Sequence, residues 1–290
     1  MTANKVALDT ETRTRIIATK ITCPFLGSAA NQERLTILGE IGNPLANIED
    51  VRRLGNTGGG DLGDLLVLFA EGNHAFMRGG SGAVLDTPVP QGTFSLELPG
   101  SQGSHPGHSG ILQGDPRKLD SGRLSVQDFD RLAALAKGGS IKRADVGRFI
   151  AETLKRDAAS KVIGAGVAQL LLEDLGELLG AAGGLLLGLV LSNGAGARLR
   201  PLEEKLTKLM GEDNLVGSSG EFGLLFAFLS RSPRAGALDG EQALSFADVR
   251  TMFLDKRLPE GWELWSKTRA DWVVHTASLV VSAAREFSSH

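Results

Sequence analysis

Residues 125–156 read SVQDFDRLAALAKGGSIKRADVGRFIAETLKR, and this stretch decides the fold class. Ser125 followed by Asp128 approximates the capping box that opens a helix, and the apolar residues after it recur at helical spacing. A second helix is expected to begin near Lys142. One face of that helix is apolar, formed by Val146, Phe149, Ile150 and Leu154. The stretch therefore predicts two consecutive amphipathic helices.

The same periodicity extends over much of the chain. Further helices are expected near residues 61–77, 201–210, 220–229, 246–253 and 269–287. Residues 27–60 read as a polar connection, and residues 79–116 are rich in Gly, Pro, Ser and Gln, with short strand-like segments such as 93–98 that suffice for one hairpin. We therefore predict a mainly α protein. It would be a single all-helical domain over residues 1–290, with a polar N-terminal segment at 1–20 and a long loop region at 79–116 containing little β structure.

The most apolar stretch covers residues 162–191, and residues 178–197 carry no charge. An uncharged run of this length is long enough to span a bilayer. However, Glu173, Asp174 and Glu177 stand just before it, glycines dilute it, and neither an aromatic belt nor a basic cluster flanks it. We expect a buried core helix and no membrane association.

Composition excludes several classes of protein. The 290 residues are 42% apolar and 22% charged, which is typical of a globular chain and not of a disordered one. The 31 basic and 34 acidic residues give a net charge of −3, so no nucleic-acid partner is expected. The first 20 residues contain no apolar segment of a secretory signal, so we expect a cytoplasmic location.

Two glycine patterns resemble ligand-binding loops but lack the residues that bind. Residues 58–60 are all glycine, yet they follow no strand and precede no Lys-Ser/Thr pair, so we interpret them as a hinge or a helix entry rather than a phosphate-binding loop. Residues 122–128 and 139–145 share a pattern similar to the back half of an EF-hand pair. Arg117 stands at the first ligand position of that comparison, so no calcium site is expected.

Cys23 is the only cysteine, and Pro24 follows it. A single cysteine excludes a disulfide within the chain and any zinc site that needs two or more thiolates. Proline is favoured in the first turn of a helix, so Cys23 is expected beside the unpaired N–H groups of a helix start, which stabilise a thiolate. Such a thiolate can be an axial ligand of haem iron. The alternative is that Cys23 is a small buried hydrophobic residue.

The five histidines are candidate acid–base groups. His105 and His108 lie in the loop region with no further His or Cys nearby, so they do not predict a zinc site. One of them can move a proton between the oxygens of a peroxide, because imidazole titrates near neutral pH; the alternative is a solvated loop histidine. His74 is expected at a helix end, while His275 and His290 lie on or after the last helix with no partner in the sequence.

The order of these motifs resembles the haem-thiolate peroxidase family of chloroperoxidases and unspecific peroxygenases. Thr22-Cys23-Pro24 is similar to the Pro-Cys-Pro ligand motif of that family. Residues 106–115 are similar to its Glu-His-Asp stretch, with His108 on the motif histidine, and Gly220-Glu221-Phe222 is similar to its C-terminal Gly-Glu helix. Residues 249–262, which include Arg-Leu-Pro and Gly-Trp, are similar to the Phe…Arg-Leu-Pro…Gly-Trp ending and form the most specific match.

The resemblance implies an oxidoreductase that contains haem b. The Cys23 thiolate would bind the iron, with Pro24 and Phe25 also at the cofactor. Hydrogen peroxide would oxidise a hydrophobic small molecule, and the apolar glycine-rich helix would line its channel. The alternative is a non-enzymatic helical binding or scaffold protein whose loop at 79–116 is the partner site.

On the distal side, the resemblance implies that His108 hydrogen-bonds a carboxylate that transfers the proton of the peroxide. Glu177 is the first candidate for this carboxylate and Glu173 the second, because both precede the apolar run. The two acids of the family motif are replaced by Gly107 and Ser109, so the divalent cation that family members hold is not expected here.

Overall fold

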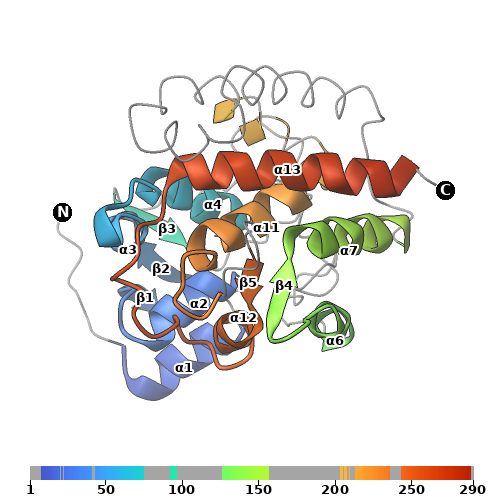
Figure 1. Ribbon diagram of the computed structural model, residues 1–290. Helices are drawn as coiled ribbons and strands as arrows, with labels where there is room; N and C mark the ends of the chain where they lie inside the picture. Colours follow the sequence, from blue (N-terminus) through green and yellow to red (C-terminus); the bar gives the residue numbers. More distant parts are fainter. Residues whose placement is uncertain are drawn as a thin grey trace. The chain divides into compact units, whose positions relative to one another are not determined.

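The chain consists of two compact units, which are described separately. The computed structural model (Figure 1) describes residues 8–19, 21, 23–40, 43–74, 92–96, 126–156, 203–204, 206–207, 209, 213–235 and 243–288. The first unit comprises Met1–His105, Leu112–Val126 and Ala247–Lys267, and the second comprises Pro106–Ile111, Gln127–Phe246 and Thr268–His290. Each unit therefore combines segments that are distant in sequence.

Helices dominate the described residues, of which 65% are helical. The predicted mainly α fold class is therefore confirmed. The described residues form the α-helices α1 (Thr10–Thr19), α2 (Pro24–Asn31), α3 (Ile48–Gly55), α4 (Gly63–His74), α6 (Val126–Ala134), α7 (Arg143–Arg156), α11 (Asn214–Leu229), α12 (Phe246–Phe253) and α13 (Arg269–Ser288). The other elements are a 3₁₀ turn η1 (Thr57–Gly59) and the strands β1 (Ile37–Glu40), β2 (Asn43–Asn47), β3 (Thr93–Ser95), β4 (Ser140–Lys142) and β5 (Ala243–Ser245).

The first unit contains a three-stranded antiparallel sheet in the order β1-β2-β3. Leu45 of β2 pairs with Leu38 of β1 on one side and with Ser95 of β3 on the other. The prediction that residues 27–60 form a polar connection is wrong, because they contain β1, β2 and α3. Strands of four or five residues show too few alternations for a sequence pattern to reveal them.

A side-chain cap explains why α3 begins where β2 ends. Asn47 is the last residue of β2, and its Oδ1 accepts a hydrogen bond from the backbone N–H of Glu49 at 2.9 Å. Acidic residues in the first turn of α3 and arginines in the last turn complement the helix dipole. The helix expected at 61–77 is confirmed as α4 within the described residues.

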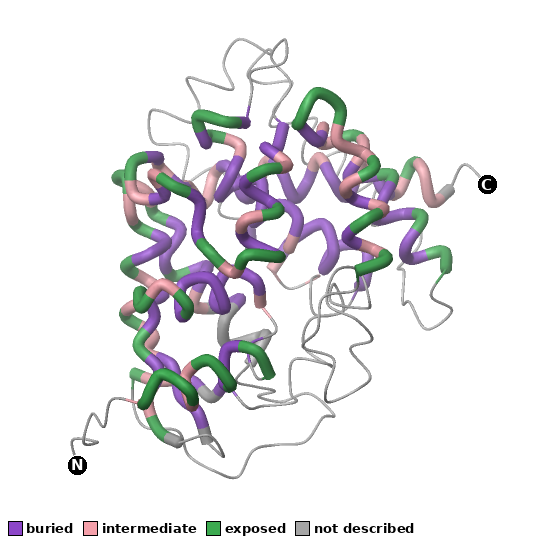
Figure 2. The backbone as a smooth tube through the Cα atoms, turned by 90° about the horizontal axis from the view of Figure 1, so that it is seen from below, coloured by how far each residue is buried: buried purple, intermediate pink, exposed green. Residues whose placement is uncertain are grey.

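The second unit is built around α11. Every residue of this helix except Glu221 is buried. Figure 2 draws the buried residues of the described chain in purple. The indole Nε1 of Trp272 in α13 donates to the carbonyl oxygen of Gly220 at 3.0 Å, and Phe222 meets Phe149 of α7 edge-on with ring centroids 5.9 Å apart. Gly223 has no side chain, and this allows Thr276 of α13 to pack directly against the backbone of α11. Close backbone approach and aromatic contacts together hold α7, α11 and α13.

The helical periodicity located several elements closely. The predicted apolar face of α7 is buried, and α12 and α13 occupy the ranges expected for them. Helix α11 begins at Asn214 rather than near residue 220, because the carboxylate of Asp213 caps it by accepting from the N–H of Val216 at 2.8 Å. No described helix has the length and apolarity needed to cross a membrane. The apolar run at 162–191 lies outside the described residues.

A short two-stranded sheet in the second unit joins two segments whose following sequences are alike. Strand β4 pairs antiparallel with β5, and Ile141 lies opposite Leu244. The sequence after each strand reads Ala-Asp-Val, at 144–146 and at 247–249. The segment at 139–145 therefore pairs, through β4, with the strand that precedes α12. The two strands are about a hundred residues apart, so a comparison of neighbouring segments does not reveal that they pair.

Candidate thiolate site

Helix α2 begins directly after Cys23. Cys23 occupies the N-cap position in an extended conformation, with φ −67° and ψ 121°, and Pro24 is in the first helical turn. The carbonyl oxygen of Cys23 accepts from the N–H of Gly27 at 2.9 Å, which closes that turn. The expected helix start is confirmed. The Cys23 side chain makes no hydrogen bond that caps the helix.

Burial distinguishes Cys23 from the helix that follows it. Residues 24–30 are all buried, whereas Cys23 is half-buried. Cys23 is therefore more accessible than the residues of the helix that it precedes, and its interpretation as a small buried hydrophobic residue stays an alternative. A partly accessible sulfur at a helix start, in the only cysteine of the chain, has the environment that reactive or metal-binding thiolates share.

Three hydrogen bonds join α2 and its C-cap residue to the end of α12 and the segment that follows it. The hydroxyl of Ser28 donates to the carbonyl oxygen of Met252 at 3.0 Å, and Asn31 Nδ2 donates to that of Lys256 at 2.9 Å. The N–H of Leu258 donates to Gln32 Oε1, also at 2.9 Å. Within the first unit, the Cys-Pro motif and the C-terminal Arg-Leu-Pro motif therefore lie together.

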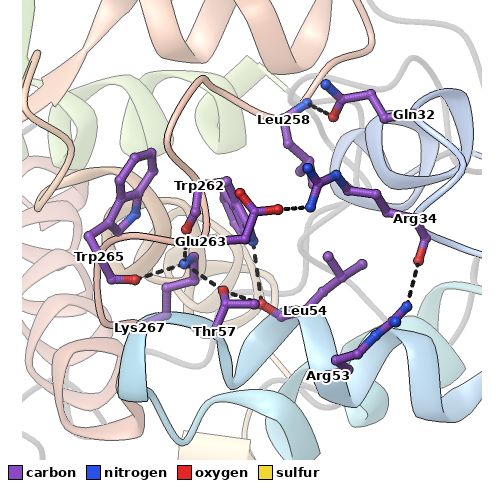
Figure 3. A network of polar contacts seen from close by, with 10 residues as sticks. All are labelled: Gln32, Arg34, Arg53, Leu54, Thr57, Leu258, Trp262, Glu263, Trp265 and Lys267. Carbon is purple, nitrogen blue, oxygen red and sulfur yellow. Dashed lines mark hydrogen bonds and ion pairs between the residues drawn. The ribbon is translucent and has the colours of Figure 1, made fainter.

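Trp262 adds an aromatic contact to these hydrogen bonds. Its indole packs on Phe25 with ring centroids 5.6 Å apart. Its Nε1 donates to the carbonyl oxygen of Leu54 at 3.3 Å (Figure 3). Phe25, predicted to lie at a cofactor, is 4% exposed and contributes one ring face to Trp262. Phe25 and Trp262 thus fix the first turn of α2, and with it the position of Cys23.

Lys256 supplies a positive charge near the sulfur. A Cβ atom built on Gly27 would lie 3.5 Å from Lys256 Cδ and 3.9 Å from its Nζ, so the lysine side chain lies along the first turns of α2. Burial lowers the pKa of Lys256, and the charge of the Cys23 thiolate acts in the opposite direction. No sequence pattern indicates this pairing, because Lys256 lies in a charged turn far from Cys23 in the sequence.

A second lysine, Lys267, is enclosed by tryptophans (Figure 3). Its side chain is fully buried, and its Nζ donates to Thr57 Oγ1 and to the Trp265 carbonyl oxygen, each at 2.9 Å, and to the Trp262 carbonyl oxygen. The ammonium lies 4.4 Å from the ring centroid of Trp262 and 5.2 Å from that of Trp265. Burial lowers the pKa of Lys267 to about 7.

The glycine triplet at 58–60 packs against the backbone beside this lysine. A Cβ atom on Gly58 would come closer than 3.0 Å to the backbone of Trp265, and one on Gly60 would do the same at Lys267. The N–H of Asp61 donates to the Lys267 carbonyl oxygen at 3.1 Å. The interpretation of the triplet as a helix entry is confirmed, since η1 and these contacts lead into α4.

The predicted distal residues cannot be placed beside Cys23. His108, Glu173 and Glu177 lie outside the described residues, as do His105 and His290 and the side chain of His74. His275 is described: it is fully buried in the second unit and stacks on Phe226 with ring centroids 5.0 Å apart. Within the described part of the chain, no group of three or more His, Cys, Asp or Glu residues is placed to hold a metal ion.

Comparisons of the chain with protein-family models, with curated proteins and with solved structures found no match. The case for a cofactor therefore stands on the residues around Cys23. A half-buried sulfur at a helix N-terminus, with an ammonium group nearby, suits an anionic sulfur ligand, which is the donor that haem-thiolate proteins use.

Proposed function

We propose that this protein is a haem-thiolate peroxidase or peroxygenase that uses hydrogen peroxide to oxidise a hydrophobic small molecule. The observation that carries the proposal is the contact between the Cys23-Pro24 helix start and residues 252–262. The same two segments carry the most consequential and the most specific motifs of the family resemblance. Their contact is what a shared site requires of segments so distant in sequence.

Cys23 would hold the iron through its sulfur, and the bound haem would supply the oxidising chemistry toward peroxide. Helix α2 orients the sulfur, because Pro24 sets the direction of the first turn and the Phe25–Trp262 contact holds that turn in place. The positive end of the helix dipole and the Lys256 ammonium both favour the anionic form of the sulfur. These residues perform no proton transfer.

Proton transfer is assigned to the distal residues. His108 would orient the carboxylate of Glu177, or of Glu173, so that a proton moves from one peroxide oxygen to the other. General acid–base assistance of this kind contributes roughly 10²–10⁴ in rate. His108→Ala is therefore expected to slow peroxide-dependent turnover by about that factor while haem content stays unchanged. A loss below about twofold would remove His108 from the reaction and favour the solvated-loop alternative.

Absorption spectroscopy of the chain reconstituted with haem tests the function. The wild-type protein is expected to show a Soret band that moves strongly to the red in the reduced carbonyl complex, as thiolate ligation requires. Cys23→Ser is expected to lose this shift while keeping its helical circular dichroism, because serine is a favoured N-cap residue. Cys23→His offers a neutral ligand and is the matched control: it is expected to retain haem without the thiolate spectrum.

Two results would overturn the proposal at different levels. A wild-type chain that takes up no haem removes the enzymatic function and leaves the binding or scaffold alternative. A red-shifted carbonyl complex that persists in Cys23→Ser shows that haem binds elsewhere and removes Cys23 as the iron ligand.

A further inference from the structure

A closed ring of hydrogen bonds holds Trp262 (Figure 3). Its indole Nε1 donates to the carbonyl oxygen of Leu54 at 3.3 Å, and its own carbonyl oxygen accepts from Lys267 Nζ. Lys267 Nζ also donates to Thr57 Oγ1 at 2.9 Å, and the Thr57 hydroxyl donates to the same Leu54 oxygen at 3.0 Å. Trp262 is therefore fixed both at its backbone and at its indole ring.

The Lys267 amine is the centre of this ring of bonds. It also donates to the carbonyl oxygen of Trp265 at 2.9 Å, so one amine ties the carbonyl groups of Trp262 and Trp265 together. Trp262 and Lys267 are almost wholly buried. A buried acceptor that loses its donor costs free energy, so removal of the amine would leave several acceptors unsatisfied at once.

The contacts of Trp262 lead to the start of α2. Its ring packs on that of Phe25, with centroids 5.6 Å apart and an angle of 34° between the ring planes. Phe25 lies in the first turn of α2, two residues after Cys23, and the Cys23 side chain makes no hydrogen bond that caps the helix. The place of the sulfur therefore depends on the turn that Phe25 anchors.

We propose that Lys267 is a positioning residue that acts through Trp262 and Phe25 to hold the first turn of α2, and so keeps the Cys23 sulfur half-buried and in one place. This inference deepens the proposed function and rests on it for the use made of the sulfur. The lysine acts through two aromatic rings and not on the sulfur itself. These contacts form without haem, so they can be tested on the chain without cofactor.

The test is the rate at which iodoacetamide alkylates the haem-free chain at about pH 9.5. Cys23 is the only cysteine, so the rate reports this sulfur alone. An ordinary thiol has a pKa of about 8.5 and is roughly nine-tenths ionised at this pH, so the rate follows access to the sulfur rather than its ionisation. Lys267→Met keeps an apolar stem and removes the donors. It is expected to speed alkylation by roughly tenfold, because the turn opens more often.

Two tryptophan variants separate positioning from a general loss of stability. Trp262→Phe keeps a ring against Phe25 but loses the indole donor, and it is expected to speed alkylation by about fivefold. Trp272→Phe is the matched control, because the buried Trp272 indole likewise donates to a backbone carbonyl oxygen, that of Gly220 at 3.0 Å, but in the second unit. The control is expected to alkylate at the wild-type rate.

Lys267→Gln retains N–H donors on a shorter, uncharged side chain, so its rate is expected between those of the wild type and Lys267→Met. Wild-type rates in both Lys267→Met and Trp262→Phe would overturn the proposal. An equal acceleration in Trp272→Phe would also overturn it, because the effect would then come from lower stability alone. If Lys267→Met does not fold, the comparison of the two tryptophan variants decides. None of these outcomes depends on haem uptake, so failure of the proposed function remains distinguishable.

Discussion

The hydroxyl of Ser28 donates a hydrogen bond to the carbonyl oxygen of Met252 at 3.0 Å, and the two residues are 224 positions apart in sequence. The hydroxyl oxygen of Ser28 also lies 2.7 Å from the carbonyl oxygen of Pro24. The hydroxyl therefore bridges the first turn of α2 and the end of α12. Both partners are buried carbonyl groups. Ser28 therefore joins the helix that presents Cys23 to the segment that carries Lys256.

Ser28→Ala is expected to destabilise the protein by about 1–3 kcal/mol, because it leaves a buried carbonyl oxygen without its donor. Chemical denaturation monitored by circular dichroism measures the change. Ser278→Ala is the matched control, since the Ser278 hydroxyl donates to the Val274 carbonyl oxygen of its own helix and joins no distant described segment. It is expected to change stability by less than about 0.5 kcal/mol. Equal effects in the two variants would show that the Ser28 bridge contributes nothing specific.

The glycine triplet offers a graded test of backbone packing. Gly59 has φ +75° and open space around it, so Gly59→Ala is expected to cost about 1–2 kcal/mol from strain alone. Gly58 combines a φ of +64° with a clash against Trp265. Gly58→Ala is therefore expected to cost about 3 kcal/mol or more. Denaturation midpoints of the two variants measure the difference, and equal costs would contradict the contact between Gly58 and the Trp265 backbone.

Local patterns in the sequence predicted local structure. The apolar face of α7 and the limits of α12 follow from helical spacing within a single segment, and the start of α2 follows from Pro24. The residues of β3 indicated a strand. They did not indicate its pairing with β2, since α3 and α4 lie between Leu45 and Ser95 in the sequence. The pairing of β2 with β3 is a contact between distant segments, and a pattern read over about ten residues contains no information about such contacts.

In the candidate site too, the local feature was predicted from the sequence and the contacts between distant segments were not. Cys23 was identified from one dipeptide, whereas the contacts of Lys256 with α2 and of Lys267 with Thr57 join distant segments. The Lys267–Thr57 bond spans 210 positions. No spacing rule links such residues, and a lysine in a turn is ordinarily a solvated charge. Their roles became visible only through burial and through the atoms that surround each amine.

Lys267 is expected to make stability depend on alkaline pH. Burial lowers its pKa from 10.5 to about 7, so between these values the unfolded chain holds a proton that the folded chain has released. The free energy of unfolding therefore rises with pH across this window, by about 2 kcal/mol between pH 7 and pH 9. Lys267→Met has no group to titrate and is expected to lack this increment. Urea denaturation of both proteins at the two pH values isolates it, and parallel pH profiles would show that Lys267 keeps its ordinary pKa.

His275 is expected to make the second unit sensitive to acid. Its Nδ1 faces Arg143 Nη1 at 3.4 Å, and because a guanidinium only donates, this nitrogen accepts and the imidazole is neutral. Burial, with the charges of Arg143 and Arg231, lowers the pKa of His275 to about 3 from 6.5. As pH falls below 6.5, the unfolded chain takes up a proton that the folded chain excludes. Stability is therefore fully present above pH 6.5 and declines toward pH 3, by about 2–3 kcal/mol between pH 7 and pH 4.5.

His275→Phe tests this account, because it keeps a ring against Phe226 and removes the titrating group. The variant is expected to lose less stability than the wild type between pH 7 and pH 4.5, by the increment given above, since the carboxylates common to both proteins cancel in the comparison. Arg143→Gln removes one charge that opposes protonation of the imidazole, which raises the pKa of His275 toward its ordinary value. Its acid loss should fall between those of the wild type and His275→Phe. Denaturant midpoints at pH 7 and pH 4.5 give the loss of stability in acid for the wild type and both variants. If His275→Phe loses as much stability as the wild type, the acid sensitivity belongs to other groups.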